Sequence, residues 1–139
     1  MNVSAVLNDL SSKKSFLIGL IFISKADKKI DDREIMFFNN AGISLGLDES
    51  SLQDIASCWH KDVCPRLDFS NMIQKKLFIR EAIQLSQIDK HYAEPERELI
   101  FKIATELGVS AADVEALENW VVEGISWQKK GNELIGMEV

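Results

Sequence analysis

Glycine, proline and cysteine are scarce in this chain. Its 139 residues include seven glycines, two prolines and two cysteines, which excludes a collagen-like repeat, a loop-rich all-β fold and a disulfide-built scaffold. The apolar share of 46% is too high for a disordered segment. One compact all-α domain is the class that fits this length and composition.

A long hydrophobic run is also missing. The longest one, from Phe16 to Ile23, covers eight residues, far short of the ~20 that a membrane-spanning helix needs. The first ten residues contain Asp9 and lack the basic and apolar regions of a secretory signal. We therefore expect a cytoplasmic protein that does not insert into a membrane.

Positive charge is in deficit. Sixteen Lys and Arg residues stand against twenty-two Asp and Glu residues, which gives a formal net charge of −6. Such a chain repels phosphate over most of its surface, so nucleic acid is not an expected partner. An acidic protein attracts cations more readily.

The two cysteines fit neither a disulfide framework nor a CxxC motif. Cys58, His60 and Cys64 bring three soft-metal ligands close together in the sequence, but a zinc site there lacks a fourth ligand and the usual spacing. Nothing in the sequence specifies a base or an oxyanion hole for a thiol nucleophile. We expect two free thiols.

An internal repeat is the most informative feature of the sequence. Residues 13–55 align without a gap to residues 75–117, at a shift of 62. Ten of the 43 aligned positions are identical, where chance predicts about two or three. The identical pairs are Lys13/Lys75, Lys14/Lys76, Phe16/Phe78, Ile21/Ile83, Ser24/Ser86, Asp27/Asp89, Lys28/Lys90, Glu34/Glu96, Leu45/Leu107 and Gly46/Gly108. Two copies of a helical hairpin, each followed by a further helix, therefore build one domain.

Each hairpin places two carboxylates beside its turn. Apolar residues of the first helix recur at i, i+4 and i+7, and Asp27 or Asp89 takes position i+11 of the same stripe. The inward stripe of the next helix begins with Glu34 or Glu96. Partial burial and mutual repulsion of such a pair call for a proton, a basic side chain, backbone N–H groups or a bound cation.

Helix initiation explains the same acidity without a ligand. Asp31 can cap the second helix of the first copy and form a capping box with Glu34, and Pro95 suits the first helical turn of the second copy. Both second helices are expected to end at a glycine, Gly46 or Gly108, in a left-handed conformation.

The two acidic turns resemble those of TerB-like domains. Residues 26–34 and 88–96, each leading to a Leu-Gly-[Leu/Val] stop, are similar to the family pattern A-D-G-x-[IV/Y]-x-x-x-E. The family includes tellurite-resistance proteins and a cytoplasmic domain of DjlA-type co-chaperones. The resemblance covers about residues 13–125 and implies an all-helical bundle in a bacterial cytoplasm, linked to stress or to membrane-associated complexes. It also implies a divalent cation of unknown identity, held by Asp27, Glu34, Asp89 and Glu96.

The chain departs from this pattern in both turns. The glycine that usually follows the Asp is Lys28 in one copy and Lys90 in the other, and an ammonium group can satisfy an Asp without a metal. An EF-hand is excluded, because its loop positions 1 and 3 in the first copy would be Ile23 and Lys25.

We expect about seven helices in one domain over residues 1–127, followed by a C-terminal tail over 128–139 that either frays or docks. Loops this short make neighbouring helices antiparallel. Outside the hairpins, helices are expected over 2–10, 51–61 and 111–127, with a connector over 62–70 and Ser70 as the cap of a helix over 71–87. The three tryptophans are expected to wedge helix–helix seams: Trp59, Trp120 and Trp127.

The leading functional hypothesis is a non-enzymatic TerB-like protein, associated with stress or tellurite resistance, that binds a divalent cation at its acidic turns. The alternative is a metal-independent adaptor that binds protein partners in a cytoplasmic or membrane-associated complex. A third hypothesis is an enzyme that uses a carboxylate-bound metal as a Lewis acid. The sequence specifies neither the partner nor the oligomeric state, and it leaves open whether the two turns share one site.

Overall fold

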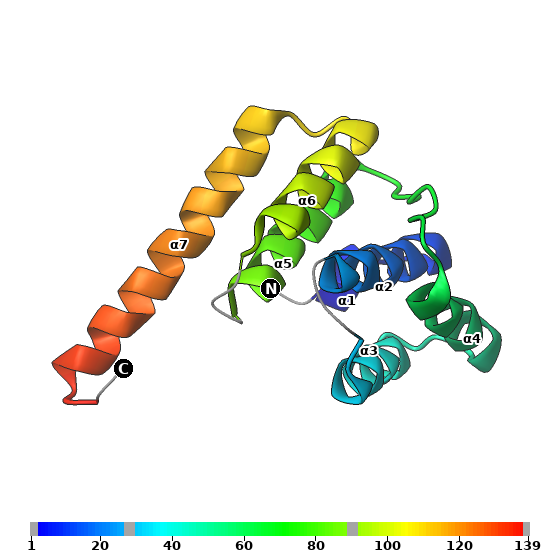
Figure 1. Cartoon of the computed structure of the whole chain (residues 1–139), viewed down its shortest axis with the longest axis horizontal. Helices are drawn as coiled ribbons and strands as arrows, with labels where there is room; N and C mark the ends of the chain where they lie inside the picture. The colour runs from blue at the N-terminus through cyan, green and yellow to red at the C-terminus, as the bar shows by residue number, and fades with distance from the viewer. Residues whose placement is uncertain (1–2, 27–29, 89–91, 138–139) are drawn as a thin grey trace.

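The computed structural model describes residues 3–26, 30–88 and 92–137. These residues form an all-α bundle of seven α-helices and one short 3₁₀ helix, with no strand among them (Figure 1). The helices are α1 (Val3–Val6), α2 (Leu10–Lys25), α3 (Asp32–Ser44), α4 (Glu49–Ser57), η1 (Cys58–His60), α5 (Met72–Ile88), α6 (Glu94–Leu107) and α7 (Ala111–Leu134). The predicted fold class is confirmed.

The two copies of the repeat form equivalent elements. Shifting α2, α3 and the start of α4 by 62 positions gives the bounds of α5, α6 and the start of α7 to within one residue. Gly46 and Gly108 have φ values of +79° and +80°, a conformation that strains any residue with a Cβ. Two residues after each glycine a side chain caps a new helix: Asp48 accepts from the Ser51 N–H, and Ser110 accepts from the Asp113 N–H. The helix ends and helix caps therefore repeat along with the sequence.

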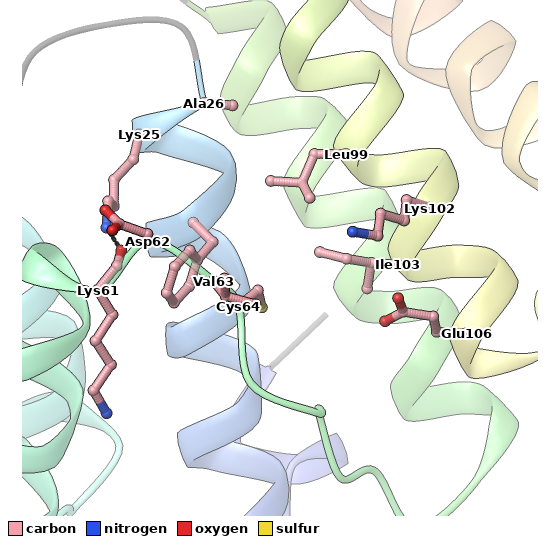
Figure 2. A pocket seen from close by; sticks show the side chains of 11 residues that line it. Lys25, Ala26, Lys61, Asp62, Val63, Cys64, Leu99, Lys102, Ile103 and Glu106 are labelled. Atoms are coloured by element: carbon pink, nitrogen blue, oxygen red, sulfur yellow. Dashed lines mark hydrogen bonds between the residues drawn. The ribbon is translucent and has the colours of Figure 1, made fainter.

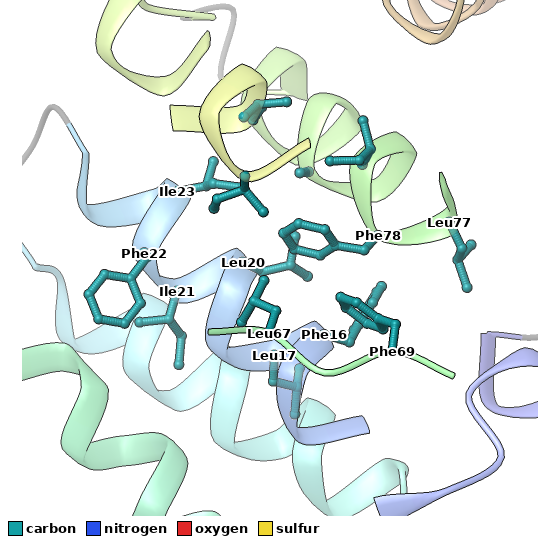
Figure 3. Close-up of a cluster of buried hydrophobic side chains, with 14 of the residues drawn as sticks. Phe16, Leu17, Leu20, Ile21, Phe22, Ile23, Leu67, Phe69, Leu77 and Phe78 are labelled. Atoms are coloured by element: carbon teal, nitrogen blue, oxygen red, sulfur yellow. The ribbon is translucent and has the colours of Figure 1, made fainter. Parts of the chain in front are cut away.

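The copies meet where α2 packs against α5. Phe16 and Phe78, which are equivalent in the repeat, touch edge to face with ring centroids 6.4 Å apart. Figure 3 shows Phe78 enclosed by Phe16, Leu20, Leu67 and Phe69, and its side chain is fully buried. Since these groups come from α2, α5 and the segment between the copies, the chain has one shared core.

The connector between the copies is part of that core. Leu67 and Phe69 are buried, and the ring of Phe69 stacks on Phe78 at 5.6 Å. The hydroxyl of Ser15 accepts a hydrogen bond from the Asp68 N–H at 2.8 Å. The expected connector over 62–70 is thus extended but closely packed.

A hydrogen-bond network fixes the start of α2 beside the start of α5. Asp9 caps α2 by accepting from the Ser12 N–H, and it also accepts from the Ser70 hydroxyl, both at 2.7 Å. These bonds lower the pKa of Asp9. The buried Gln74 amide donates to the Val6 carbonyl at 3.0 Å. The expected Ser70 cap is wrong, because Asn71 caps α5 by accepting from the Gln74 N–H.

Three helix boundaries also differ from the sequence-based expectation. The first helix covers only Val3–Val6, since Asp9 starts α2 at Leu10. The helix expected over 51–61 ends at Ser57 and tightens into η1, where the carbonyls of Cys58 and of Lys61, the residue after η1, accept from the Lys25 ammonium group. The last helix continues seven residues past Trp127 to Leu134. It ends where Gly136 adopts a φ of +85°, because glycine meets no penalty there.

The tryptophans divide into two groups. Trp59 is buried and packs against Phe38, with centroids 5.6 Å apart, as expected. Trp120 is 50% exposed and Trp127 is 76% exposed, so the expectation that they wedge helix seams is wrong. No helix within the described ranges is both long enough and apolar enough to cross a bilayer.

Two glycines inside helices should respond in opposite ways to the same substitution. A Cβ on Gly19 would lie 2.5 Å from the buried ring of Phe78, whereas a Cβ on Gly124 meets no atom within 4 Å. We expect Gly19→Ala to destabilise the fold by about 1–3 kcal/mol, because the ring cannot move aside. Gly124→Ala should stabilise the helix by about 0.5–1 kcal/mol.

Urea denaturation of both variants at low protein concentration measures these changes. No loss of stability in Gly19→Ala would show that the packing around Phe78 is looser than described. A loss of stability in Gly124→Ala would contradict the open surroundings of Gly124 in α7.

Candidate functional site

The predicted metal ligands are only partly within the described residues. Asp27 and Asp89 lie outside them, so the distance between the two turns is not defined by the structure. Glu34 and Glu96 are described, in the first turns of α3 and α6. Over the described ranges, no three His, Cys, Asp or Glu side chains are grouped closely enough to hold a metal ion.

Glu96 is almost completely buried, with 4% of its surface exposed. Its Oε1 atom accepts a hydrogen bond from the Ala93 N–H at 3.3 Å. Ala93 precedes α6 and has no polar side chain of its own with which to cap the helix. Glu96 therefore satisfies the start of its own helix, which is the local role that helix initiation predicts for it.

Glu34 is half-buried at the equivalent position of the first copy. Asp31 caps α3 by accepting from the Arg33 N–H at 2.7 Å, and the Glu34 N–H donates to the Asp31 carbonyl at 3.0 Å. The predicted cap is confirmed. The acidity of this turn thus contributes to helix initiation as well.

A charged clamp follows the second turn and joins α6 to α7. Arg97 donates to both carboxylate oxygens of Glu118, at 2.9 and 3.2 Å, and Tyr92 donates to one of them at 2.7 Å. The guanidinium of Arg97 also lies 4.5 Å from the centroid of the Phe101 ring. Burial and the bond to Glu118 raise the pKa of Tyr92, and the same carboxylate raises the pKa of Arg97. We call Tyr92, Arg97, Phe101 and Glu118 the α6–α7 clamp.

The first copy lacks this clamp entirely. Its equivalent residues, at a shift of 62, are Ile30, Ile35, Asn39 and Ala56. None of them carries a charge, and three are apolar. The space that the clamp fills between α6 and α7 is consequently left open between α3 and α4.

An apolar groove of 280 Å³ occupies that space. Its apolar lining comes from Ile35, Met36, Phe38, Leu52, Ile55, Ala56 and Trp59, and its polar lining from Asp32 and Asn39. Phe38 and Trp59 form a buried floor, whereas Met36 is 65% exposed. We call this feature the α3–α4 groove. Identical positions of the repeat give no sign of it; only the positions that differ between copies do.

A second cavity, of about 490 Å³, lies between α2, α6 and the connector. Figure 2 shows the connector with Cys64 facing Lys102, Ile103 and Glu106 across it. Lys25 lines one wall, and its ammonium group is already bonded to the carbonyls of Cys58 and Lys61. The cavity is therefore lined by both acidic and basic side chains, and none of the basic ones among these residues is buried.

The cysteine and histidine candidates do not assemble into a site. Cys58 is buried and Cys64 half-buried, and both are free thiols, as expected. His60 is exposed, and the three residues do not form a metal-binding group. Burial, followed by the proximity of Cys58 and Glu106, raises the pKa of Cys64 to about 11.

Comparison of the chain with protein-family models, curated proteins and solved structures gave no match.

Cys64 should react slowly with alkylating reagents. With a pKa of about 11 instead of 9.0, the thiolate at pH 8 is about 100-fold scarcer, and the thiolate is the reactive form. The rate of reaction with iodoacetamide, measured against pH in a Cys58→Ala variant, should rise to half its maximum well above pH 9 but below pH 11, because burial still raises the pKa of Cys64 while the contribution of Cys58 is removed. The same variant unfolded in urea serves as the control and should show the ordinary pKa. A folded-state midpoint near pH 9 would contradict this electrostatic description.

Proposed function

We propose that this chain is a non-enzymatic interaction module that binds a basic amphipathic helix of another protein in the α3–α4 groove, without a metal. The observation that carries the proposal is the contrast between the two copies. The α6–α7 clamp fills one inter-helix space with Arg97 and Glu118, whereas Ile35 and Ala56 leave the equivalent space open and apolar.

The composition of the groove favours a helical ligand. An amphipathic helix places apolar side chains at i, i+3 and i+7, which suits a narrow groove between two helices. Met36 at the rim can adapt its flexible thioether to different side chains. Phe37, beside it on α3, is 59% exposed and enlarges the apolar surface. Exposed apolar surface of this kind commonly marks a binding site.

The charge of the α3–α4 groove and of the whole chain indicates that the partner is basic. Asp32 lines the groove, and none of the described residues that line it is basic. The whole chain has a net charge of −6. Lysine or arginine on the polar face of a bound helix would therefore be attracted, and acidic segments repelled.

Transplanting the clamp into the first copy tests the proposal. We expect Ile35→Arg/Asn39→Phe/Ala56→Glu to fill the groove and to weaken binding of a synthetic Leu/Lys amphipathic peptide at least about tenfold, because apolar contact is lost. Fluorescence anisotropy of the labelled peptide measures the dissociation constant. The matched control is Val122→Glu/Ile125→Arg, which adds the same charges to exposed apolar positions of α7 and should leave binding unchanged.

Two results would contradict this function. One is equal affinity of the wild-type chain for Leu/Lys and Leu/Glu peptides, which would indicate unspecific adsorption. The other is equal binding by the clamp variant and the α7 control.

Cation binding at the acidic turns is a second candidate, which the TerB-like resemblance implies. One observation favours it: buried polar groups flank the second turn. Glu96 is buried on one side, and on the other the hydroxyl of Ser86 is buried without a hydrogen-bond partner among the described residues. Such groups are normally satisfied, by protein, water or an ion.

Calorimetric titration with Ca²⁺, Mg²⁺, Mn²⁺ and Zn²⁺ separates the two candidates. If the turns bind a cation, the wild-type chain should release or absorb heat and melt at a higher temperature with the ion, since a ligand of the native state stabilises it. Glu34→Gln/Glu96→Gln should abolish both effects. Peptide binding that persists in a chelator, together with no heat from any of the four ions, would leave the metal-independent module as the function.

A further inference from the structure

The C-terminal half of α7 is a helix without a covering surface. Figure 1 shows it reaching beyond the ends of α5 and α6. From Val122 to Leu134 every residue except Asn132 is exposed. An isolated helical segment of this length is marginal in water. Its regular termination at Gly136, where the Met137 N–H donates to the Asn132 carbonyl at 2.9 Å, nevertheless gives it a defined end.

On one face of α7, large apolar side chains alternate with glycines. The members follow each other at three- or four-residue steps, so they share a helical stripe. They are Trp120, Gly124, Trp127, Gly131 and Leu134. We call this set the Trp–Gly stripe. Trp127 and Leu134 are 76% and 78% exposed. The guanidinium carbon of Arg80 lies over the Trp120 ring, 5.4 Å from its centroid.

No neighbouring atom among the described residues requires the glycines of the stripe to lack a Cβ. A Cβ on Gly124 or Gly131 would meet no atom within 4 Å. Each glycine nevertheless destabilises the helix by about 1 kcal/mol relative to alanine. Gly131 lines a surface hollow together with Trp127 and Leu134. A hollow beside a projecting indole has the shape that a second indole can fill.

We propose that two copies of this chain associate by antiparallel pairing of α7 along the Trp–Gly stripe. In one register both tryptophans of each copy meet glycines of the other. Trp127 lies over Gly124 of the second copy, and Trp120 lies over Gly131. The twofold symmetry of such a pair repeats each contact.

Charge complementarity supports the same register. Glu123 and Lys130 are two helical turns apart on one flank of the stripe, and both are exposed. Antiparallel pairing brings Glu123 of each copy beside Lys130 of the other, which gives two opposite-charge contacts. In a parallel pair each flank meets the opposite flank of the other copy, so Glu123 and Lys130 would face the uncharged Gln128 and Ile135, and both opposite-charge contacts would be lost.

The available area is sufficient for association. A large aromatic side chain offers up to about 250 Å², so the exposed parts of Trp120 and Trp127 contribute roughly 300 Å² from each chain. Leu134 and the flanking residues bring the total for both chains near the ~1,000 Å² of a specific interface. We therefore expect a weak, concentration-dependent dimer.

Sedimentation equilibrium over a range of concentrations tests the pairing. The wild-type chain should approach a dimer, and Trp127→Ala should raise the dissociation constant about 100-fold or more, because the substitution removes a central aromatic from both sides. Gly124→Gln/Gly131→Gln should also prevent dimerisation while the monomer stays folded, since the hollows are filled. Val122→Ser, an exposed apolar position on another face of α7, is the matched control and should leave the dimer intact.

A charge exchange tests the register. Glu123→Lys and Lys130→Glu should each weaken the dimer about tenfold, and the double exchange should restore it. A chain that is monomeric at its highest soluble concentration overturns the proposal. Additive effects of the two charge variants, without restoration, overturn the antiparallel register. The clamp variant of the α3–α4 groove should dimerise normally, so failure of either proposal is distinguishable from failure of the other.

Discussion

Close packing of α2 against α5 is the constraint on which the rest of the structure depends. The ring of Phe78 fits against Gly19, where a Cβ would lie 2.5 Å away, and the connector residue Leu67 closes the same space. The position equivalent to Gly19 in the second copy is Glu81, so the copies have diverged at the point where they meet. Because one ring is shared by both copies and the connector, neither half has a complete core of its own.

Much of this fold could be predicted from local sequence chemistry. The stops at Gly46 and Gly108 occur where expected, and they depend on neighbouring residues only, as do the caps at Asp48 and Ser110 that follow them. Two features were not predictable in this way. Nothing local indicated that the connector would be buried, or that α7 would continue past Trp127 without support from the core.

The candidate sites show the same division. Glu96 is almost completely buried and Glu34 is half-buried. For both, at least partial burial was predictable, because each begins an apolar stripe. The α3–α4 groove was not, because it arises from a difference between the copies and not from a motif. An ion pair such as Arg97 with Glu118 is retained or lost as a unit, since removal of one partner leaves a charge unpaired. The first copy has neither partner, and Ile35 and Ala56 present an apolar surface at the equivalent positions.

The two proposed surfaces have a joint consequence for affinity. The α3–α4 groove belongs to the first copy of the repeat, whereas the Trp–Gly stripe belongs to the last helix of the second copy. Pairing through α7 therefore leaves both grooves of a dimer available. A groove of 280 Å³ can bury only a small apolar area and should bind one helix weakly. Two grooves on one dimer convert the second binding event into an intramolecular one for a partner that presents two such helices. The exposed stripe would then contribute to recognition without touching the ligand.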